Sequence, residues 1–202
     1  MYERYIKRFL DIMIALIALA VLMIPMLVTA ILLKLDSPGP VLFRQRRMGI
    51  DRREFQMLKF RTMSAMAPAD MPTHLLKNAA AYSTPFQLFL RKYSIDELPQ
   101  LICVLRNQMS IIGPRPALWN QYDLLAERDK YGANNVRPGL TGWAQINGRD
   151  ELPIEIKARY DGEYVERMSF LFDCKCFFGT IGAVLRHDGV REGSQQKEMA
   201  EP

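Results

Sequence analysis

The feature that most constrains this chain is a run of 22 residues without a charged side chain, from Ile12 to Leu33. A run of this length is sufficient for a helix that crosses the hydrocarbon core of a bilayer, which needs about 20 residues. No convincing small-residue cleavage site of a secretory signal follows it, so we expect the segment to be retained. The chain is therefore expected to be membrane-bound and not a soluble domain.

A proline near the middle of this run argues against a simple span. Pro25 lacks a backbone N–H and its ring clashes with the preceding turn, so it should kink or break the helix. Basic residues flank both ends of the run, which favours both flanks on the cytoplasmic side. A helix hairpin broken at Pro25 that enters and leaves through the same leaflet satisfies both observations. A single kinked transmembrane helix is the alternative.

The rest of the chain predicts one α+β domain that is predominantly α. Its 202 residues are 49% hydrophobic and 24% charged, which fits one globular domain and not a disordered chain. Two short strands form a small β-hairpin around GIDRRE, PFQLFLRK is an amphipathic interfacial helix, and two longer helices follow residue 153. We expect a membrane anchor at 1–36, one compact cytoplasmic domain at 37–190 and a polar tail at 191–202.

The stretch SIDELPQL contains two adjacent carboxylates, Asp96 and Glu97, for which two interpretations are open. Ser94 and Glu97 have the spacing of a capping box, and acidic residues in a first turn suit the helix dipole. Alternatively, the pair carries chemistry. Apolar residues at helical spacing follow the pair, so we expect both carboxylates at the exposed mouth of a packed helix.

Basic side chains beside proline, glycine or this acidic pair form a second candidate group. The chain has a net charge of +5, which indicates an anionic partner. Arginine is the preferred residue for bidentate phosphate recognition, although each of these residues taken alone could be a surface charge. Carboxylates among such cations favour phosphoryl transfer with a divalent ion, and an aspartate can itself attack phosphorus. The group comprises Lys59, Arg61, Arg91, Arg115, Arg137 and Arg149.

The motifs KRFLD, KFRTM, SIDELPQL, GPRP and VRPGLTGWAQINGR, together with the proline-interrupted apolar segment, occur here in one order. As a set they resemble the bacterial sugar transferase family, the small monotopic phosphoglycosyl transferases, over residues 2–190. The resemblance implies Mg²⁺-dependent transfer of a sugar 1-phosphate from a UDP-sugar to undecaprenyl phosphate, with release of UMP. It also implies the re-entrant hairpin and a catalytic domain at the cytoplasmic face of the bacterial inner membrane.

The resemblance places the family's catalytic dyad on Asp96 and Glu97. It implies that Asp96 is the nucleophile that forms a covalent phosphosugar intermediate, and that Glu97 assists. We also expect Asp96 to ligate Mg²⁺, Gln145 and Asn147 to contact uracil or ribose, and Asp161 to serve the metal or the nucleotide. Phosphate or nucleotide contacts are expected from Lys59, Arg61, Arg91, Arg115, Arg137 and Arg149.

Expected partners are the UDP-sugar, polyprenyl phosphate and membrane lipids, with a homodimer allowed and no nucleic acid. This sequence departs from the family at Ile24, where many relatives have serine before the proline, and at Gln87-Leu88, where relatives often have Gly-Arg. The sugar stays open. A membrane-anchored, non-catalytic scaffold that binds anionic lipid or nucleic acid is the alternative function, and UMP release from UDP-sugars would distinguish the two.

Overall fold

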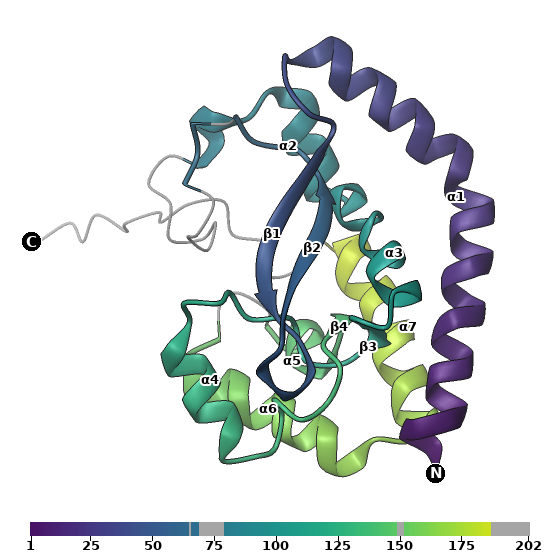
Figure 1. Cartoon of the computed structure of the whole chain (residues 1–202), viewed down its shortest axis with the longest axis vertical. Helices are drawn as coiled ribbons and strands as arrows, with labels where there is room; N and C mark the ends of the chain where they lie inside the picture. Colours follow the sequence, from purple (N-terminus) through teal and green to yellow (C-terminus); the bar gives the residue numbers. More distant parts are fainter. Residues whose placement is uncertain (65, 69–78, 149–151, 187–202) are drawn as a thin grey trace, which may run out of the picture.

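The computed structural model describes residues 1–64, 66–68, 79–148 and 152–186, and it shows a mostly helical α+β fold (Figure 1). Two pairs of short strands accompany the helices among these residues. The elements are a π-helical turn (Tyr2–Lys7), α1 (Arg8–Asp36), β1 (Leu42–Met48), β2 (Glu54–Phe60), α2 (Pro85–Lys92), α3 (Gln100–Leu105), β3 (Ser110–Ile112), α4 (Tyr122–Asp129), β4 (Gly139–Thr141), α5 (Trp143–Ile146), α6 (Ile154–Arg167) and α7 (Phe170–Arg186).

The apolar segment forms one continuous helix, and the expected break at Pro25 is not confirmed. Residues Arg8–Asp36 are α-helical with Pro25 inside, and the helix including its first turn is long and apolar enough to cross a membrane. The Thr29 hydroxyl donates a hydrogen bond of 2.9 Å to the Pro25 carbonyl. A hydroxyl that bonds the carbonyl four residues back tends to bend a helix. The contact ends at the carbonyl of Pro25, the residue after Ile24.

Helix α1 has one buried and one exposed face, and it runs along one side of the molecule (Figure 1). Ala15 and Leu33 are fully buried against the domain at helical spacing. The outward face consists of large apolar side chains that stay exposed among the described residues. They include Phe9, Met13, Ile17, Val21, Met23, Ile24, Leu27, Val28, Ile31 and Leu35.

The predicted β-hairpin is confirmed. Strands β1 and β2 pair antiparallel, with Leu42 opposite Phe60 and Met48 opposite Glu54. Phe55, Met57, Leu58 and Phe60 of β2 are buried, and the first three pack in the core with α3 and the first half of α1. The hairpin therefore presents the residues at the end of β2 to the start of α3.

A parallel pairing of β3 with β4 was not predicted, because each strand has only three residues. The two strands belong to the segments that contain GPRP and the glycine-rich VRPGLTGW motif. A Cβ on Gly142 would lie 2.0 Å from the Gly113 carbonyl oxygen, so no larger residue fits there. The glycines thus allow the two motifs to pack backbone against backbone.

Helix α2 confirms the predicted amphipathic helix, and it explains the departure at Gln87. Thr84 and Gln87 form a complete capping box at its start. The Gln87 side-chain amide also donates a hydrogen bond of 2.9 Å to the Ser37 hydroxyl, and the Thr84 hydroxyl donates one of 2.7 Å to the Asp36 carboxylate. These contacts attach α2 to the C-terminal end of α1.

The two longer helices predicted after residue 153 are confirmed as α6 and α7. A short 3-10 turn at Ala79–Tyr82 lies between β2 and α2, and residues 69–78 before it lie outside the described residues. The predicted polar tail also lies outside them.

Candidate active site

The two carboxylates of SIDELPQL lie in a 3-10 turn, Ile95–Glu97, immediately before α3. We expected both carboxylates at the exposed mouth of a helix, and this expectation is wrong, because Asp96 and Glu97 are each only 8% exposed. The capping-box interpretation of Ser94, one of the two left open, is not supported either. Ser94 adopts a left-handed backbone conformation with φ of 56°, and its side chain makes no capping hydrogen bond. The chain turns sharply at Ser94 and directs the two acidic residues inward.

Two cations from separate elements converge on Glu97. Lys59 Nζ, near the end of β2, lies 2.9 Å from Glu97 Oε1. Arg115 Nη2 lies 2.7 Å from the same oxygen, and Arg115 Nη1 lies 3.4 Å from Oε2. Three predicted site residues are therefore brought together by β2, the turn before α3 and the segment after β3.

The prolines of GPRP hold the backbone on both sides of Arg115. The Pro114 carbonyl accepts a hydrogen bond of 2.8 Å from Gly139, and the Pro116 carbonyl accepts one of 2.8 Å from Arg47. Proline also fixes its own φ near −65°. The Arg115 side chain consequently starts from a rigid backbone, as the sequence predicted.

The Asp96 carboxyl is buried and lies near several positively charged side chains. Burial raises the pKa of its carboxyl to about 6, because the charged form loses hydration, and the neighbouring Glu97 charge adds to this rise. Lys59 opposes the rise most strongly, followed by Arg91 and Arg115. A carboxyl with this pKa is mostly ionised at neutral pH, so Asp96 can act as a nucleophile or bind a cation.

The Asp96 carboxylate is also unengaged in the part of the chain that the structure describes. No described residue donates a hydrogen bond to it, whereas Glu97 is held by two cations. The adjacent carboxylates therefore differ in what they can do. Glu97 forms ion pairs with Lys59 and Arg115, and the Asp96 oxygens accept no hydrogen bond from a described residue.

Two predicted site residues have structural partners elsewhere. Arg61 donates hydrogen bonds to the Pro40 carbonyl at 2.7 Å and to Ser37 at 3.0 Å, which fixes the turn after α1. Asp161 is 1% exposed and pairs with Arg128 at 2.6 Å between α6 and α4. The structure does not bring either residue to the dyad.

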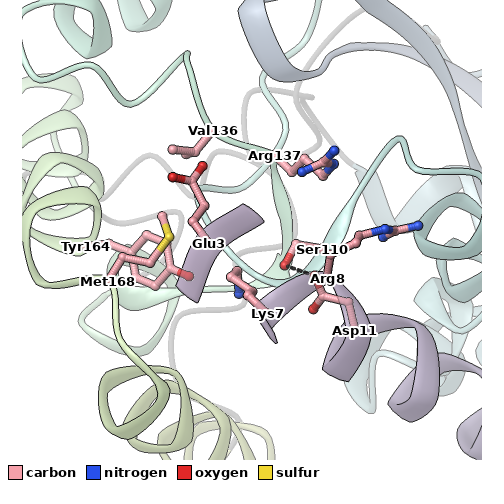
Figure 2. A pocket seen from close by; sticks show the side chains of 9 residues that line it. All are labelled: Glu3, Lys7, Arg8, Asp11, Ser110, Val136, Arg137, Tyr164 and Met168. Carbon is pink, nitrogen blue, oxygen red and sulfur yellow. Dashed lines mark hydrogen bonds between the residues drawn. The ribbon is translucent and has the colours of Figure 1, made fainter. Parts of the chain in front are cut away.

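The predicted residues of the glycine-rich segment are not brought to the dyad either. The Gln145 amide donates to the Leu140 carbonyl and the Asn147 amide to the Trp143 carbonyl, so both bond within their own segment. Arg137 lines a small pocket at the N-terminal end of α1 (Figure 2). Arg149 lies outside the described residues.

The motif KRFLD has a role that the sequence reasoning missed. Arg8 Nη2 donates a hydrogen bond of 2.7 Å to the Val104 carbonyl at the end of α3. The Asp11 carboxylate accepts hydrogen bonds from the Ser110 hydroxyl and the Ile111 N–H. Lys7 pairs with the buried Asp173 of α7 at 2.7 Å. Charged residues at the start of an apolar helix were a usable signal, since each needs a partner when buried.

Comparison with known proteins identifies the family. A family model described as bacterial sugar transferase matches residues 2–187. The chain belongs to this family. This transferase is 37% identical over 187 residues to the sugar transferase EpsL of Bacillus subtilis, covering 93% of this chain and 91% of that one.

Two larger relatives are named for their reactions. The transferase is 41% identical over 187 residues to the UDP-glucose:undecaprenyl-phosphate glucose-1-phosphate transferase of Escherichia coli, covering 89% of this chain and 40% of that one. It is 37% identical over 193 residues to the UDP-N-acetylgalactosamine-undecaprenyl-phosphate N-acetylgalactosaminephosphotransferase of Aeromonas hydrophila. This match covers 93% of this chain and 45% of that one. The transferase thus spans less than half the length of these two relatives.

Proposed function

We propose that the protein transfers a sugar 1-phosphate from a UDP-sugar to a polyprenyl phosphate such as undecaprenyl phosphate, releasing UMP. The observation that carries this proposal is the buried Asp96 carboxylate beside Glu97, Lys59 and Arg115. Relatives over nearly the whole of this chain are named for that reaction with different sugars. The common part of those names supports the reaction, and the sugar stays unassigned.

The proposed chemistry has two displacements at one phosphorus atom. An Asp96 carboxylate oxygen attacks the sugar-linked phosphorus of the UDP-sugar, and the bond from that phosphorus to the bridging oxygen breaks to release UMP. An oxygen of polyprenyl phosphate then attacks the same phosphorus and releases the Asp96 carboxylate. The covalent intermediate allows a soluble donor and a lipid acceptor to use one site in turn.

The cations beside the dyad stabilise charge during both displacements. Each substrate is anionic, so the approach of a carboxylate to phosphorus requires positive groups nearby. Glu97 holds Lys59 and Arg115 next to Asp96 through its two oxygens. We assign this positioning role to Glu97, and phosphate contacts to Lys59, Arg115 and Arg91.

The residues present fit a Mg²⁺ ion that arrives with the substrate. No group of three or more His, Cys, Asp or Glu side chains suited to a metal occurs among the described residues. Mg²⁺ is commonly held by one or two carboxylates together with substrate phosphates and waters. Asp96 would be the protein ligand, and the ion would neutralise charge on the diphosphate.

The proposed location is the cytoplasmic face of the bacterial inner membrane, with α1 entering and leaving through one leaflet. Contacts at both ends of α1 support this topology, because Asp11 bonds Ser110 while Asp36 bonds Thr84 of the same domain. A spanning helix would place its ends on opposite sides of about 30 Å of hydrocarbon. A bend at Pro25 would keep both ends on one side.

The reaction is tested by UMP release from a panel of UDP-sugars, with the full chain in non-ionic detergent. Without polyprenyl phosphate, we expect a burst of about one UMP per enzyme and a phosphosugar attached to the protein. Asp96→Asn should show neither, whereas Arg106→Gln, an exposed charge change in the same region, should retain both. Full activity of Asp96→Asn would refute the nucleophile, and no UMP release from any UDP-sugar would refute the reaction.

A further inference from the structure

Arg47 lies on the face of the β-hairpin that carries Lys59. In the pairing of β1 with β2, Phe43 lies directly opposite Lys59. Alternate residues of a strand share a face, so Phe43, Gln45 and Arg47 lie on the same side of the hairpin as Lys59. Lys59 pairs with Glu97, so this face of the hairpin is directed toward the dyad.

The Arg47 guanidinium makes three hydrogen bonds in two directions. Its Nε and Nη2 atoms donate to one oxygen, Gln45 Oε1, at 3.0 and 2.7 Å. Its Nη1 atom donates to the Pro116 carbonyl at 2.8 Å. A guanidinium is planar and its donors have fixed directions, so acceptors on two sides determine its orientation. Gln45, which is 9% exposed, therefore orients Arg47 toward Pro116.

The carbonyl that Arg47 holds belongs to the residue directly after Arg115. Backbone contacts with β1 continue along this segment. The Met48 N–H donates a hydrogen bond of 2.9 Å to the Ala117 carbonyl, and Arg47 forms an antiparallel bridge with Leu118. Strand β1 thus holds the backbone from which the Arg115 side chain extends.

The contact between Arg115 and the dyad depends on the position of this backbone. Arg115 Nη2 lies 2.7 Å from Glu97 Oε1, and Nη1 lies 3.4 Å from Oε2. Hydrogen bonds of this type normally span about 2.7 to 3.2 Å and weaken beyond it. A small displacement of the Arg115 backbone would therefore remove the longer contact first, and the guanidinium would lose its two-point attachment to Glu97.

The charge of Arg47 also acts on this cluster. Burial lowers the pKa of the Lys59 ammonium, and Arg115 and Arg47 add to this lowering, whereas Glu97 and Asp96 oppose it. Geometry and charge are thus two contributions of one side chain. Arg47→Lys separates them, because lysine keeps the charge and lacks the planar arrangement of donors.

We propose that Arg47, oriented by Gln45, is a positioning residue that holds the Arg115 guanidinium at the dyad for phosphoryl transfer. Arg47 acts through the backbone next to Arg115. A cation that is already in place stabilises the charge that develops in the transition state without reorganising during the reaction. This inference rests on the proposed function.

The first test measures UMP release by the full chain in non-ionic detergent, with a UDP-sugar that the wild type accepts. The amplitude of the UMP burst without polyprenyl phosphate counts the active sites, and rates are expressed per site. Arg47→Met should lower kcat about tenfold or more, because a misplaced catalytic group costs rate steeply. The KM for the UDP-sugar should stay nearly unchanged, as expected for an interaction realised in the transition state. Fewer active sites with an unchanged rate per site would show a merely structural role and overturn the proposal.

Three further variants separate geometry, charge and folding. Gln45→Leu removes the acceptor that orients Arg47 and should also lower kcat at unchanged KM, which keeps the proposal testable where Arg47→Met fails to fold. Arg47→Lys should recover little of the lost kcat, and full recovery would assign the effect to charge and overturn the positioning role. Arg44→Met removes an exposed arginine from the opposite face of β1 and should keep the wild-type kcat. An equal loss in Arg44→Met would likewise overturn the proposal.

A second measurement needs no substrate and so separates this proposal from the proposed reaction. In protein labelled with ¹⁵N-arginine, NMR relaxation reports the order parameter of the Arg115 Nε–H group, whose signal is identified by its loss in Arg115→Lys. Arg47→Met should lower this order parameter, and Arg44→Met should not. An unchanged order parameter in Arg47→Met would overturn the positioning of Arg115. A lowered one, in a protein that releases no UMP from any UDP-sugar, would support the positioning and refute the reaction.

Discussion

Lys59 is the strongest influence opposing the raised pKa of Asp96, so its removal should shift the pH dependence of the reaction. Burial already raises this pKa to about 6. Lys59→Met removes the positive charge and leaves the burial and the Glu97 charge in place. We expect the protonated form of Asp96 to persist to higher pH.

The size of the effect follows from the titration of one carboxyl. With a pKa of about 6, Asp96 is about 90% ionised at pH 7. An opposite charge at close range accounts for about one to three pH units. A shift of about two units would leave about 10% of Asp96 ionised at pH 7, so the initial rate falls about ninefold from ionisation alone. Raising the pH should restore this part of the loss.

The assay is the pH profile of kcat/KM for UMP release, which reports ionisations of the free enzyme. The acid limb of Lys59→Met should move to higher pH. Glu97→Gln serves as the opposite control, because the Glu97 charge raises the Asp96 pKa and its loss should move the limb to lower pH. A limb that stays in place in Lys59→Met, with only a lower plateau, would refute the electrostatic reasoning.

Two further predictions concern the fold and the membrane. Arg128→Met leaves Asp161 buried without its partner, so the free energy of unfolding in urea should fall by about 3 to 5 kcal/mol, and a loss below about 1 kcal/mol would contradict the pairing. In a background without native cysteines, Glu3→Cys and Pro38→Cys should be labelled from the same side of the membrane, because both ends of α1 contact one domain. Labelling from opposite sides would support the spanning helix.

Patterns local to the chain predicted much of this fold. The apolar run, the β-hairpin and the later helices depend on hydrophobic periodicity and turn residues, which neighbouring residues determine. The pairing of β3 with β4 could not be predicted in this way. Its strands have three residues each, and their contact depends on the close approach of Gly113 and Gly142.

The site was predictable in composition but not in its pairings. The sequence placed Lys59, Arg115 and the dyad in one group, and the structure brings them together. It did not predict that Arg61 would bond the turn at Ser37, because such a partner is selected by tertiary packing. Nor did it predict the buried dyad, since the left-handed conformation of Ser94 is unusual for a residue other than glycine.

The attachment of α1 at both ends has a mechanical consequence. Asp11 bonds Ser110 near one end of α1, and Asp36 bonds Thr84 at the other. A helix secured at two points cannot slide or rotate about its axis without moving the domain that holds it. The depth of the apolar face in the lipid and the height of Asp96 above the lipid surface are then coupled, because α1 and the domain move as one body. In the proposed reaction, a change in bilayer thickness would shift the whole body relative to the headgroups, and so change the distance between the acceptor phosphate and the Asp96 carboxylate.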